Sequence, residues 1–157
     1  SDLCGLHYFS HPVSFLTNYH YWRSQCAMKG VKMAKEIIST DKAPAAIGPY
    51  VQAVKSNGIL FISGQLGFDM RDGSIPEAVE MQAANSLKNL ETIMKEAGSD
   101  KSKVIKTTIF LTDMEDFGKV NEVYGQFFEG NYPARSCVAV KELPKAAKVE
   151  IECMAEL

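Results

Sequence analysis

Histidine is absent from residues 33–157 of this 157-residue sequence, because His7, His11 and His20 all lie before Met33. Ser-His-Asp and Cys-His nucleophile systems, histidine general bases and histidine-ligated zinc each need an imidazole. The larger part of the chain therefore offers none of these chemistries, and any catalysis there must rely on other side chains.

Long apolar runs and a basic surplus are also missing. No stretch reaches the roughly 18 apolar residues that a membrane helix needs. The sequence has 17 Lys and Arg against 19 Asp and Glu, for a net charge of −2, whereas proteins that bind a phosphate backbone normally carry clustered positive charge. We therefore expect no membrane partner, and the composition gives no support to nucleic acid as a partner.

The four cysteines, Cys4, Cys26, Cys137 and Cys153, show no CxxC spacing. An even number of cysteines is only weak support for disulfides. Because Cys137 and Cys153 lie among apolar neighbours in predicted strands, we expect them to be small buried side chains in a reducing compartment.

Composition divides the chain near Met33. Residues 1–32 hold six of the fifteen aromatic residues and the only tryptophan, but a single acidic residue, Asp2. We expect residues 33–157 to form one domain and residues 1–32 to be an extension: a leader, a targeting segment or a cloning remnant. The expected location is the cytoplasm, or the mitochondrion if the extension is a transit segment, although it contains only one arginine. Removing the extension is expected to leave folding and activity unchanged.

Hydrophobic periodicity predicts an α+β order of elements. Strands are expected at 36–38, 51–54, 59–62, 104–111, just beyond Pro133, and at 148–154, and helices at 77–97 and after Asp113 or Asp116. Ser56-Asn57-Gly58 predicts a hairpin turn, and Gly98 predicts the end of the first helix. We expect one mixed sheet with both helices on one face, and oligomerisation through the other face, which keeps apolar residues.

Two strand patterns supply the candidate charges. Alternation beyond the proline places Arg135 and Cys137 on one face of a strand, and alternation in the last strand places Glu150 and Glu152 on one face. If these two strands pair or neighbour each other, a guanidinium and one carboxylate would face the same small cavity. Such an arrangement suits an acidic substrate and a bound water.

Gly64 and Asn121 each leave two interpretations open. Gly64 follows a predicted buried strand, where glycine allows a ligand or a neighbouring chain to approach the backbone, or marks a β-bulge. Asn121 shares a helix face with aromatic residues, so its amide either anchors the helix to nearby backbone or contacts a site.

Several dispersed segments resemble one family. They are Ala43-Pro44-Ala45-Ala46-Ile47-Gly48-Pro49-Tyr50, Ser63-Gly64-Gln65, Lys106-Thr107-Thr108, Asp116-Phe117 with Val120-Asn121, Pro133-Ala134-Arg135-Ser136, and Leu143-Pro144-Lys145 with Val149-Glu150-Ile151-Glu152. On these segments residues 33–157 resemble the reactive intermediate deaminase A family (RidA, also YjgF). Residues 1–32 fall outside the family pattern.

The resemblance implies a chorismate-mutase-like α+β fold with a mixed, mostly antiparallel sheet. It also implies a homotrimer around a central β-barrel, with three sites in the clefts between subunits. The implied reaction is hydrolysis of 2-imino acids, such as 2-iminobutanoate and 2-iminopropanoate, to 2-oxo acids and ammonia. No metal or organic cofactor is implied, and the expected ligand is a small 2-imino or 2-oxo acid.

The same resemblance assigns roles to single residues. Carried over by position, Arg135 binds the substrate carboxylate and Glu150 positions a water. The implied binding residues around them are Tyr50, Ser63, Gly64, Asn121 and Cys137. We expect Glu152 to be structural, and we expect Cys137 to contribute its backbone, because no base lies beside its thiol in the sequence.

Two other functions stay open. Ribonuclease or translation-inhibitor activity has been attached to this family, but residues 33–157 offer neither a histidine base nor a basic stripe. The other alternative is a protein that binds small carboxylates, or a chaperone-like protein that uses its surface. Replacing Arg135 should abolish an enzymatic activity and leave a surface chaperone unaffected.

Overall fold

The structure is a computed structural model that describes residues 35–157, so Met33 and the extension 1–32 lie outside the described residues. Within the described range the chain forms six strands and two α-helices. These elements are β1 (Glu36–Ile38), β2 (Ala53–Ser56), β3 (Ile59–Leu66), α2 (Val79–Glu96), β4 (Val104–Leu111), α3 (Phe117–Phe128), β5 (Ala134–Ala139) and β6 (Val149–Glu156). The expected elements are therefore present, with boundaries that differ by a few residues.

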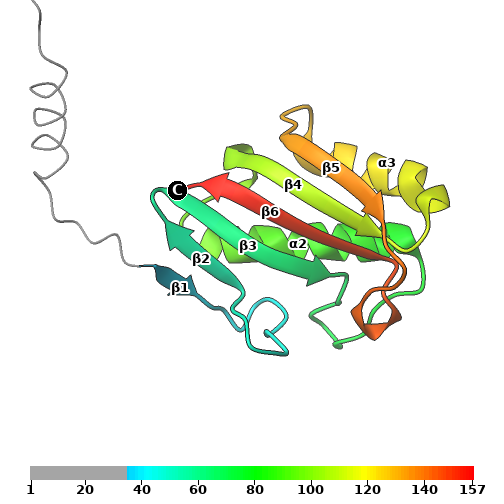
Figure 1. Cartoon of the computed structure of the whole chain (residues 1–157), viewed down its shortest axis with the longest axis horizontal. Coiled ribbons are helices and arrows are strands. Elements are labelled where there is room, and N and C mark those ends of the chain that lie inside the picture. The colour runs from blue at the N-terminus through cyan, green and yellow to red at the C-terminus, as the bar shows by residue number, and fades with distance from the viewer. Residues whose placement is uncertain (1–34) are drawn as a thin grey trace, which may run out of the picture. The chain divides into compact units, whose positions relative to one another are not determined.

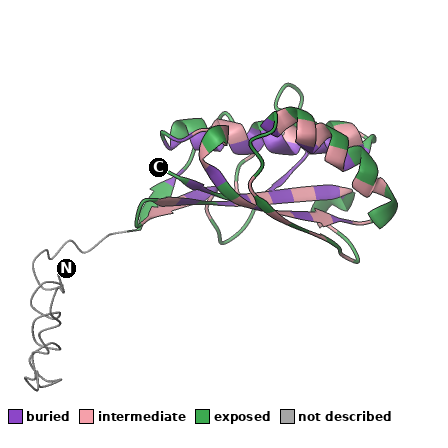
Figure 2. Cartoon of the chain, turned by 90° about the horizontal axis from the view of Figure 1, so that it is seen from above, coloured by how far each residue is buried: buried purple, intermediate pink, exposed green. Residues whose placement is uncertain are grey.

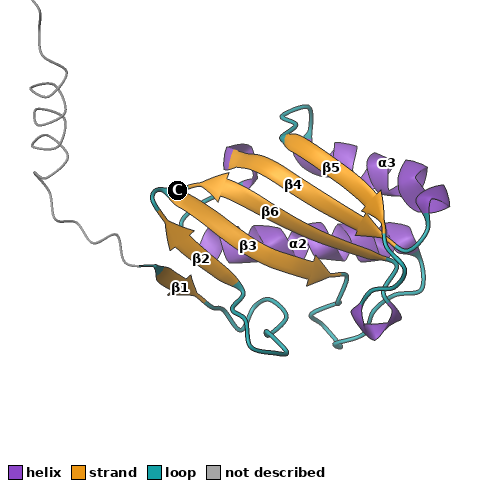
Figure 3. Ribbon diagram, viewed as in Figure 1, coloured by secondary structure: helices purple, strands orange, loops and turns teal. Residues whose placement is uncertain are grey.

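The six strands form one mixed sheet in the order β1-β2-β3-β6-β4-β5 (Figure 1). Neighbouring strands are antiparallel except β4 and β5, which are parallel and are connected through α3. Both helices lie on the same face of the sheet (Figure 3). The predicted α+β class, with two helices on one face of a mixed sheet, is confirmed.

Local chemistry accounts for the turns and helix ends. Asn57 and Gly58 have φ of 52° and 77°, the pair of positive values that a two-residue hairpin turn needs. Helix α2 ends where Gly98 adopts φ of 79°, and the Ser99 amide donates to the Met94 carbonyl, as in a glycine-terminated helix. No helix among residues 35–157 is both long and apolar enough to span a membrane.

The core lies between the sheet and the two helices (Figure 2). Its fully buried members include Leu60, Ile109 and Ile151 from the sheet and Leu87 and Ile93 from α2. Burying one such side chain contributes roughly 1.5–3 kcal/mol. This packing fixes which face of each strand points to the helices, and therefore fixes the direction of every site residue on the strands.

The other face of the sheet carries a row of apolar side chains. Ile37 lies opposite Val54, Val54 opposite Phe61, and Phe61 opposite Met154, so the row crosses four strands. Phe61 is 42% exposed and Met154 is 39% exposed in the single chain. An apolar row of this kind on an uncovered face is typical of a protein–protein contact surface.

Candidate functional site

A cavity beside β5 and α3 contains Arg135. It has a volume of about 400 Å³ and is lined by Asn121, Tyr124, Gly125, Tyr132, Pro133 and Arg135. Pro133 precedes the strand, as expected, and the alternation of β5 turns Arg135 toward the helix side of the sheet. The structure thus brings two of the residues expected at the site, Arg135 and Asn121, to one cavity.

Aromatic rings, rather than a carboxylate, surround the guanidinium of Arg135. Its Cζ atom lies 4.7 Å from the centroid of the Tyr124 ring and 5.6 Å from that of Phe117. Among residues 35–157, no Asp or Glu oxygen is within 4 Å of the guanidinium. Within residues 35–157, the positive charge is therefore held against aromatic rings and has no carboxylate partner.

Cys137 follows Arg135 by two residues and lies on the same face of β5. The thiol is free and half-buried; burial raises its pKa, and the charge of Arg135 only partly opposes that rise. A thiol that stays protonated is a poor nucleophile. The electrostatics of the site agree with a role for the backbone of Cys137 and none for its sulfur.

A second group forms where β3 meets β6. Leu66 lies opposite Glu150, and the register of β3 shifts between Ile62 and Gln65, so Ser63 and Gly64 form a bulge. A Cβ atom on Gly64 would lie 1.8 Å from Oε1 of Glu150. Both interpretations of Gly64 thus apply: the residue is part of a bulge, and it lets a carboxylate approach the backbone.

Helix α2 holds this end of β3 in place. The Ser86 hydroxyl donates to the Gln65 carbonyl, and the Asn89 amide donates to the carbonyls of Leu66 and Phe68. These bonds connect buried polar side chains of the helix to the backbone at the end of β3. The position of Gly64 is therefore set by buried polar residues of a helix on the other side of the sheet.

Tyr50 borders the same corner from the preceding loop. A small cavity of about 30 Å³ is lined by Pro44, Ala45, Ile47, Tyr50, Gln52, Gly64, Gln65, Leu66 and Phe68. A larger surface pocket beside it is lined by Tyr50 and Ser63, among others, and the Ser63 hydroxyl donates to the Val51 carbonyl at 2.7 Å. Tyr50, Ser63, Gly64 and Glu150 therefore gather at one corner.

Glu150 is half-buried at this corner, and its electrostatic state follows from that position. Burial raises the pKa of its carboxyl group, and the neighbouring charge of Glu152 raises it further. A carboxyl group with a raised pKa accepts and returns a proton more readily near neutral pH than an ordinary glutamate. Among residues 35–157, no three His, Cys, Asp or Glu side chains gather to hold a metal ion.

Within one chain, the strands that carry Arg135 and Glu150 are not neighbours, so the two side chains do not share a cavity. Strand β4 lies between β5 and β6, and the register aligns Arg135 with Thr107 and Thr107 with Cys153. Arg135 therefore shares the helix-covered face with Cys153, whereas Glu150, three residues from Cys153, points to the opposite face. One chain supplies the guanidinium and the carboxylate on different sides of its sheet.

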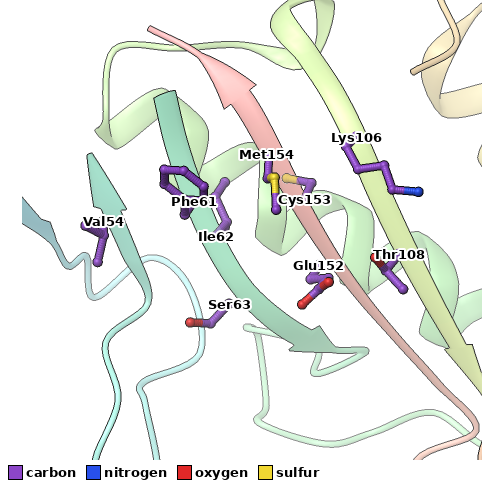
Figure 4. A pocket seen from close by; sticks show the side chains of 9 residues that line it. All are labelled: Val54, Phe61, Ile62, Ser63, Lys106, Thr108, Glu152, Cys153 and Met154. Atoms are coloured by element: carbon purple, nitrogen blue, oxygen red, sulfur yellow. The ribbon is translucent and has the colours of Figure 1, made fainter. Parts of the chain in front are cut away.

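A third hollow lies on the open face of the sheet (Figure 4). It has a volume of about 230 Å³ and is lined by Val54, Phe61, Ile62, Ser63, Lys106, Thr108, Glu152, Cys153 and Met154. Ser63 is the one expected site residue among them. Glu152 points into this hollow beside the apolar row, on the same face of β6 as Glu150.

Sequence reasoning did not assign Tyr124, Tyr132 or Phe68 to the site. The aromatic helix face that includes Tyr124 indicates only packing against the core, and the sequence around Phe68 indicates no ligand contact. The one available signal was position: Tyr132 directly precedes the Pro133–Arg135 segment, and Tyr124 lies one helical turn after Asn121.

The fold and the Arg135 cavity define a class: small α+β proteins with a six-stranded mixed sheet, two helices on one face and a cationic pocket at the parallel edge. The family model described as endoribonuclease L-PSP matches residues 40–157. The chain is 50% identical over 122 residues to mouse 2-iminobutanoate/2-iminopropanoate deaminase, covering 77% of this chain and 90% of that protein. It is 51% identical over 124 residues to the chloroplastic Reactive Intermediate Deaminase A of Arabidopsis thaliana, covering 78% and 66%.

Solved structures agree with these relatives. TdcF of E. coli with bound serine superposes with a TM-score of 0.75 at 48% identity, covering 78% of this chain and 99% of that chain. The chain therefore belongs to the RidA/YjgF family, the endoribonuclease L-PSP family of the matching model. The resemblance inferred from dispersed segments of the sequence is confirmed.

Proposed function

We propose that this protein hydrolyses reactive 2-imino acids to 2-oxo acids and ammonia. The observation that carries the proposal is the 50% identity to a mouse protein named 2-iminobutanoate/2-iminopropanoate deaminase. The pocket chemistry supports it, because an imino acid presents a planar carboxylate beside an electrophilic C=N carbon. The planar fork of Arg135 matches that carboxylate with two parallel hydrogen bonds.

The reaction needs a water held over the C=N carbon. In the proposed mechanism Arg135 fixes the substrate carboxylate, and Glu150 accepts a proton as the water attacks. The resulting carbinolamine collapses when the proton returns to nitrogen and ammonia leaves, so the carbonyl oxygen of the product comes from water. Orientation of the two reactants accounts for much of the acceleration, and Tyr50, Ser63, Gly64, Asn121 and Cys137 are the proposed binding residues around them.

We propose further that the working site forms between subunits of a homotrimer with a central barrel. Arg135 and Glu150 point to opposite faces of one sheet, so a single substrate can contact both only if two chains contribute. The apolar row Ile37, Val54, Phe61 and Met154 provides a surface for a second copy of the chain. Light scattering is expected to give a trimer, and a monomer at micromolar concentration would contradict the shared site.

To test the reaction, an amino-acid oxidase generates 2-iminopropanoate or 2-iminobutanoate in the assay mixture, and semicarbazide traps the imine that has not been hydrolysed. The protein should lower the rate of semicarbazone formation, and Arg135→Ala should abolish that effect while the trimer stays intact. A trimeric Arg135→Ala variant that hydrolyses imine at the parental rate would overturn the proposed function.

Complementation tests the shared site directly. Arg135→Ala and Glu150→Gln chains, each nearly inactive alone, are co-expressed with different tags, and mixed trimers are purified. Every mixed trimer, whichever variant supplies two of its chains, has one interface in three with both intact residues, so about a third of the parental activity should return. If both residues acted from the same chain, the mixed trimers would stay inactive.

Ribonuclease activity is the competing function, because the matching family model is described as an endoribonuclease. Residues 33–157 contain no histidine. Of the 17 Lys and Arg residues in the chain, 3 precede Met33, and of the 19 Asp and Glu residues, 1 does, so residues 33–157 hold 14 basic and 18 acidic side chains. RNA cleavage that persists in Arg135→Ala, or that separates from the trimer on purification, would mark a contaminant.

A further inference from the structure

The Tyr124 ring that faces Arg135 is itself held in place by neighbouring side chains. The hydroxyl group of Tyr124 pairs with Oγ1 of Thr107 at 2.7 Å, and both residues are buried, at 4% and 1% exposure. The Phe128 ring packs against Tyr124 with a centroid distance of 4.6 Å. Thr107 is the residue directly opposite Arg135 in the β4–β5 register, so three neighbouring residues fix one another.

This arrangement differs from the usual way of holding a half-buried arginine, which is an ion pair. A carboxylate partner would fix the guanidinium, but it would also occupy its N–H groups and neutralise its charge. An aromatic face attracts the cation through the ring quadrupole and leaves the N–H donors in the guanidinium plane free. Because the Tyr124 hydroxyl is already paired with Thr107, Tyr124 offers Arg135 its ring face.

We propose that Tyr124, fixed by Thr107 and assisted by Phe117, is a positioning residue that keeps the Arg135 guanidinium available for a carboxylate ligand. The inference rests on the proposed function, in which that carboxylate belongs to the imino acid. Tyr124 acts through Arg135, so its contribution is to ligand binding more than to the chemical step.

The test compares Tyr124→Leu with Tyr124→Phe. Leucine removes the ring face, so kcat/KM is expected to fall about 5- to 30-fold, mostly through a higher KM. The Kd of a 2-oxo acid, used as an unreactive probe and measured by calorimetry, should rise by a similar factor. Phenylalanine keeps the ring and should stay within about 3-fold of the parent, because a ring face needs no hydroxyl to attract a cation.

A double-mutant cycle separates positioning from a merely structural role. In an Arg135→Ala background, Tyr124→Leu should cause no further loss of 2-oxo acid affinity. An equal loss in both backgrounds, or an unchanged KM in Tyr124→Leu, would overturn the proposal. Failure of the proposed function looks different, because Arg135→Ala alone would then keep the parental rate.

If Tyr124→Leu does not assemble, Phe117→Leu provides a second test of the aromatic contact with Arg135. The Phe117 ring is only partly buried and lies farther from the guanidinium, so the variant should fold and raise KM about 2- to 5-fold. A parental KM in trimeric Phe117→Leu, with Tyr124→Leu unassembled, would count against the aromatic positioning of Arg135.

Discussion

The two charged residues of the proposed site are held in opposite ways. Arg135 lies over aromatic rings in a cavity of about 400 Å³, with no carboxylate partner among the described residues. Glu150 lies against the backbone at Gly64, where burial and Glu152 raise its pKa. The guanidinium is kept free to bind, whereas the surroundings of the carboxyl group raise its pKa.

Separate surroundings prevent Arg135 and Glu150 of one chain from pairing with each other. A single small cavity that held both would let them form an ion pair, which would occupy the arginine and lower the pKa of the glutamate. Opposite faces of one sheet keep them apart within a chain. Changing each residue in turn should therefore affect different steps of the reaction.

Arg135→Ala should have the largest effect. It removes a charge-assisted, bidentate contact, for which a loss of about 2–5 kcal/mol, or about 30-fold to several thousand-fold in kcat/KM, is expected. Steady-state imine hydrolysis and the affinity for a 2-oxo acid should both fall. Arg135→Lys is the matched control, and it should recover only part of the loss, because an ammonium group cannot form the two parallel bonds.

Much of this half of the site was predictable from local sequence. Pro133 sets the start of β5, and strand alternation then directs Arg135 and Cys137 to one face. The sequence could not predict that β6 would insert between β3 and β4, because strand order depends on long-range packing. That insertion separates β5 from β6, and the burial of Val149 and Ile151 against the helices turns Glu150 to the face opposite Arg135.

Glu150→Gln should have the next largest effect. Glutamine keeps the shape but cannot accept a proton, so kcat should fall about 100-fold while 2-oxo acid affinity changes less. In the parent, activity should decline as the pH falls through the raised pKa of Glu150, because the protonated form cannot act as a base. The variant should lose this acidic limb, and a pH profile of kcat that keeps it would assign the limb to another group.

Glu150→Gln should lower activity but should not lower the stability of the fold at neutral pH. Because the folded-state pKa of Glu150 is raised, its charged form destabilises the fold, and this cost grows as the pH rises from the unfolded pKa through the folded one. Glu150→Gln should therefore melt at or above the parental temperature at neutral pH. A large fall in melting temperature would show that the carboxylate makes a stabilising contact in the assembly.

Gly64→Ala should come third. The added Cβ would meet Oε1 of Glu150, the mobile end of a side chain, so the carboxylate must move while the backbone stays. A misplaced group of this kind costs about 10- to 100-fold in kcat/KM, with little change in stability. Kinetics and thermal melting, measured on the same purified sample, check both parts.

Gly67→Ala is the control for that glycine. Its Cβ would lie 2.4 Å from the Cα atom of Gln82 in α2, and a helix backbone cannot move aside as a carboxylate can. Here the cost should appear as lost stability, about 1–3 kcal/mol. If both glycine variants lost stability and activity together, the distinction between a functional and a packing glycine would fail.

The sequence separated these glycines only partly. The predicted buried strand before Gly64 marks that glycine as a point of close approach, whereas the sequence around Gly67 indicates no such contact. Its close approach to α2 depends on the bonds from Ser86 and Asn89 to the end of β3, which join residues about twenty positions apart. Local patterns carry no information about such contacts.

Glu152→Gln should have the smallest effect on kcat/KM. It tests whether the charge of Glu152 contributes to the raised pKa of Glu150. Glu152 lies in the hollow of the open face (Figure 4), whose lining includes neither Gly64 nor Arg135, so kcat/KM above the acidic limb should stay near the parental value. Its negative charge nevertheless raises the pKa of Glu150. Removing that charge should lower this pKa, so the acidic limb of the pH profile moves to lower pH while its height is unchanged. A limb that does not move would mean that burial alone sets the pKa of Glu150, and one that moves upward would contradict the assigned electrostatics.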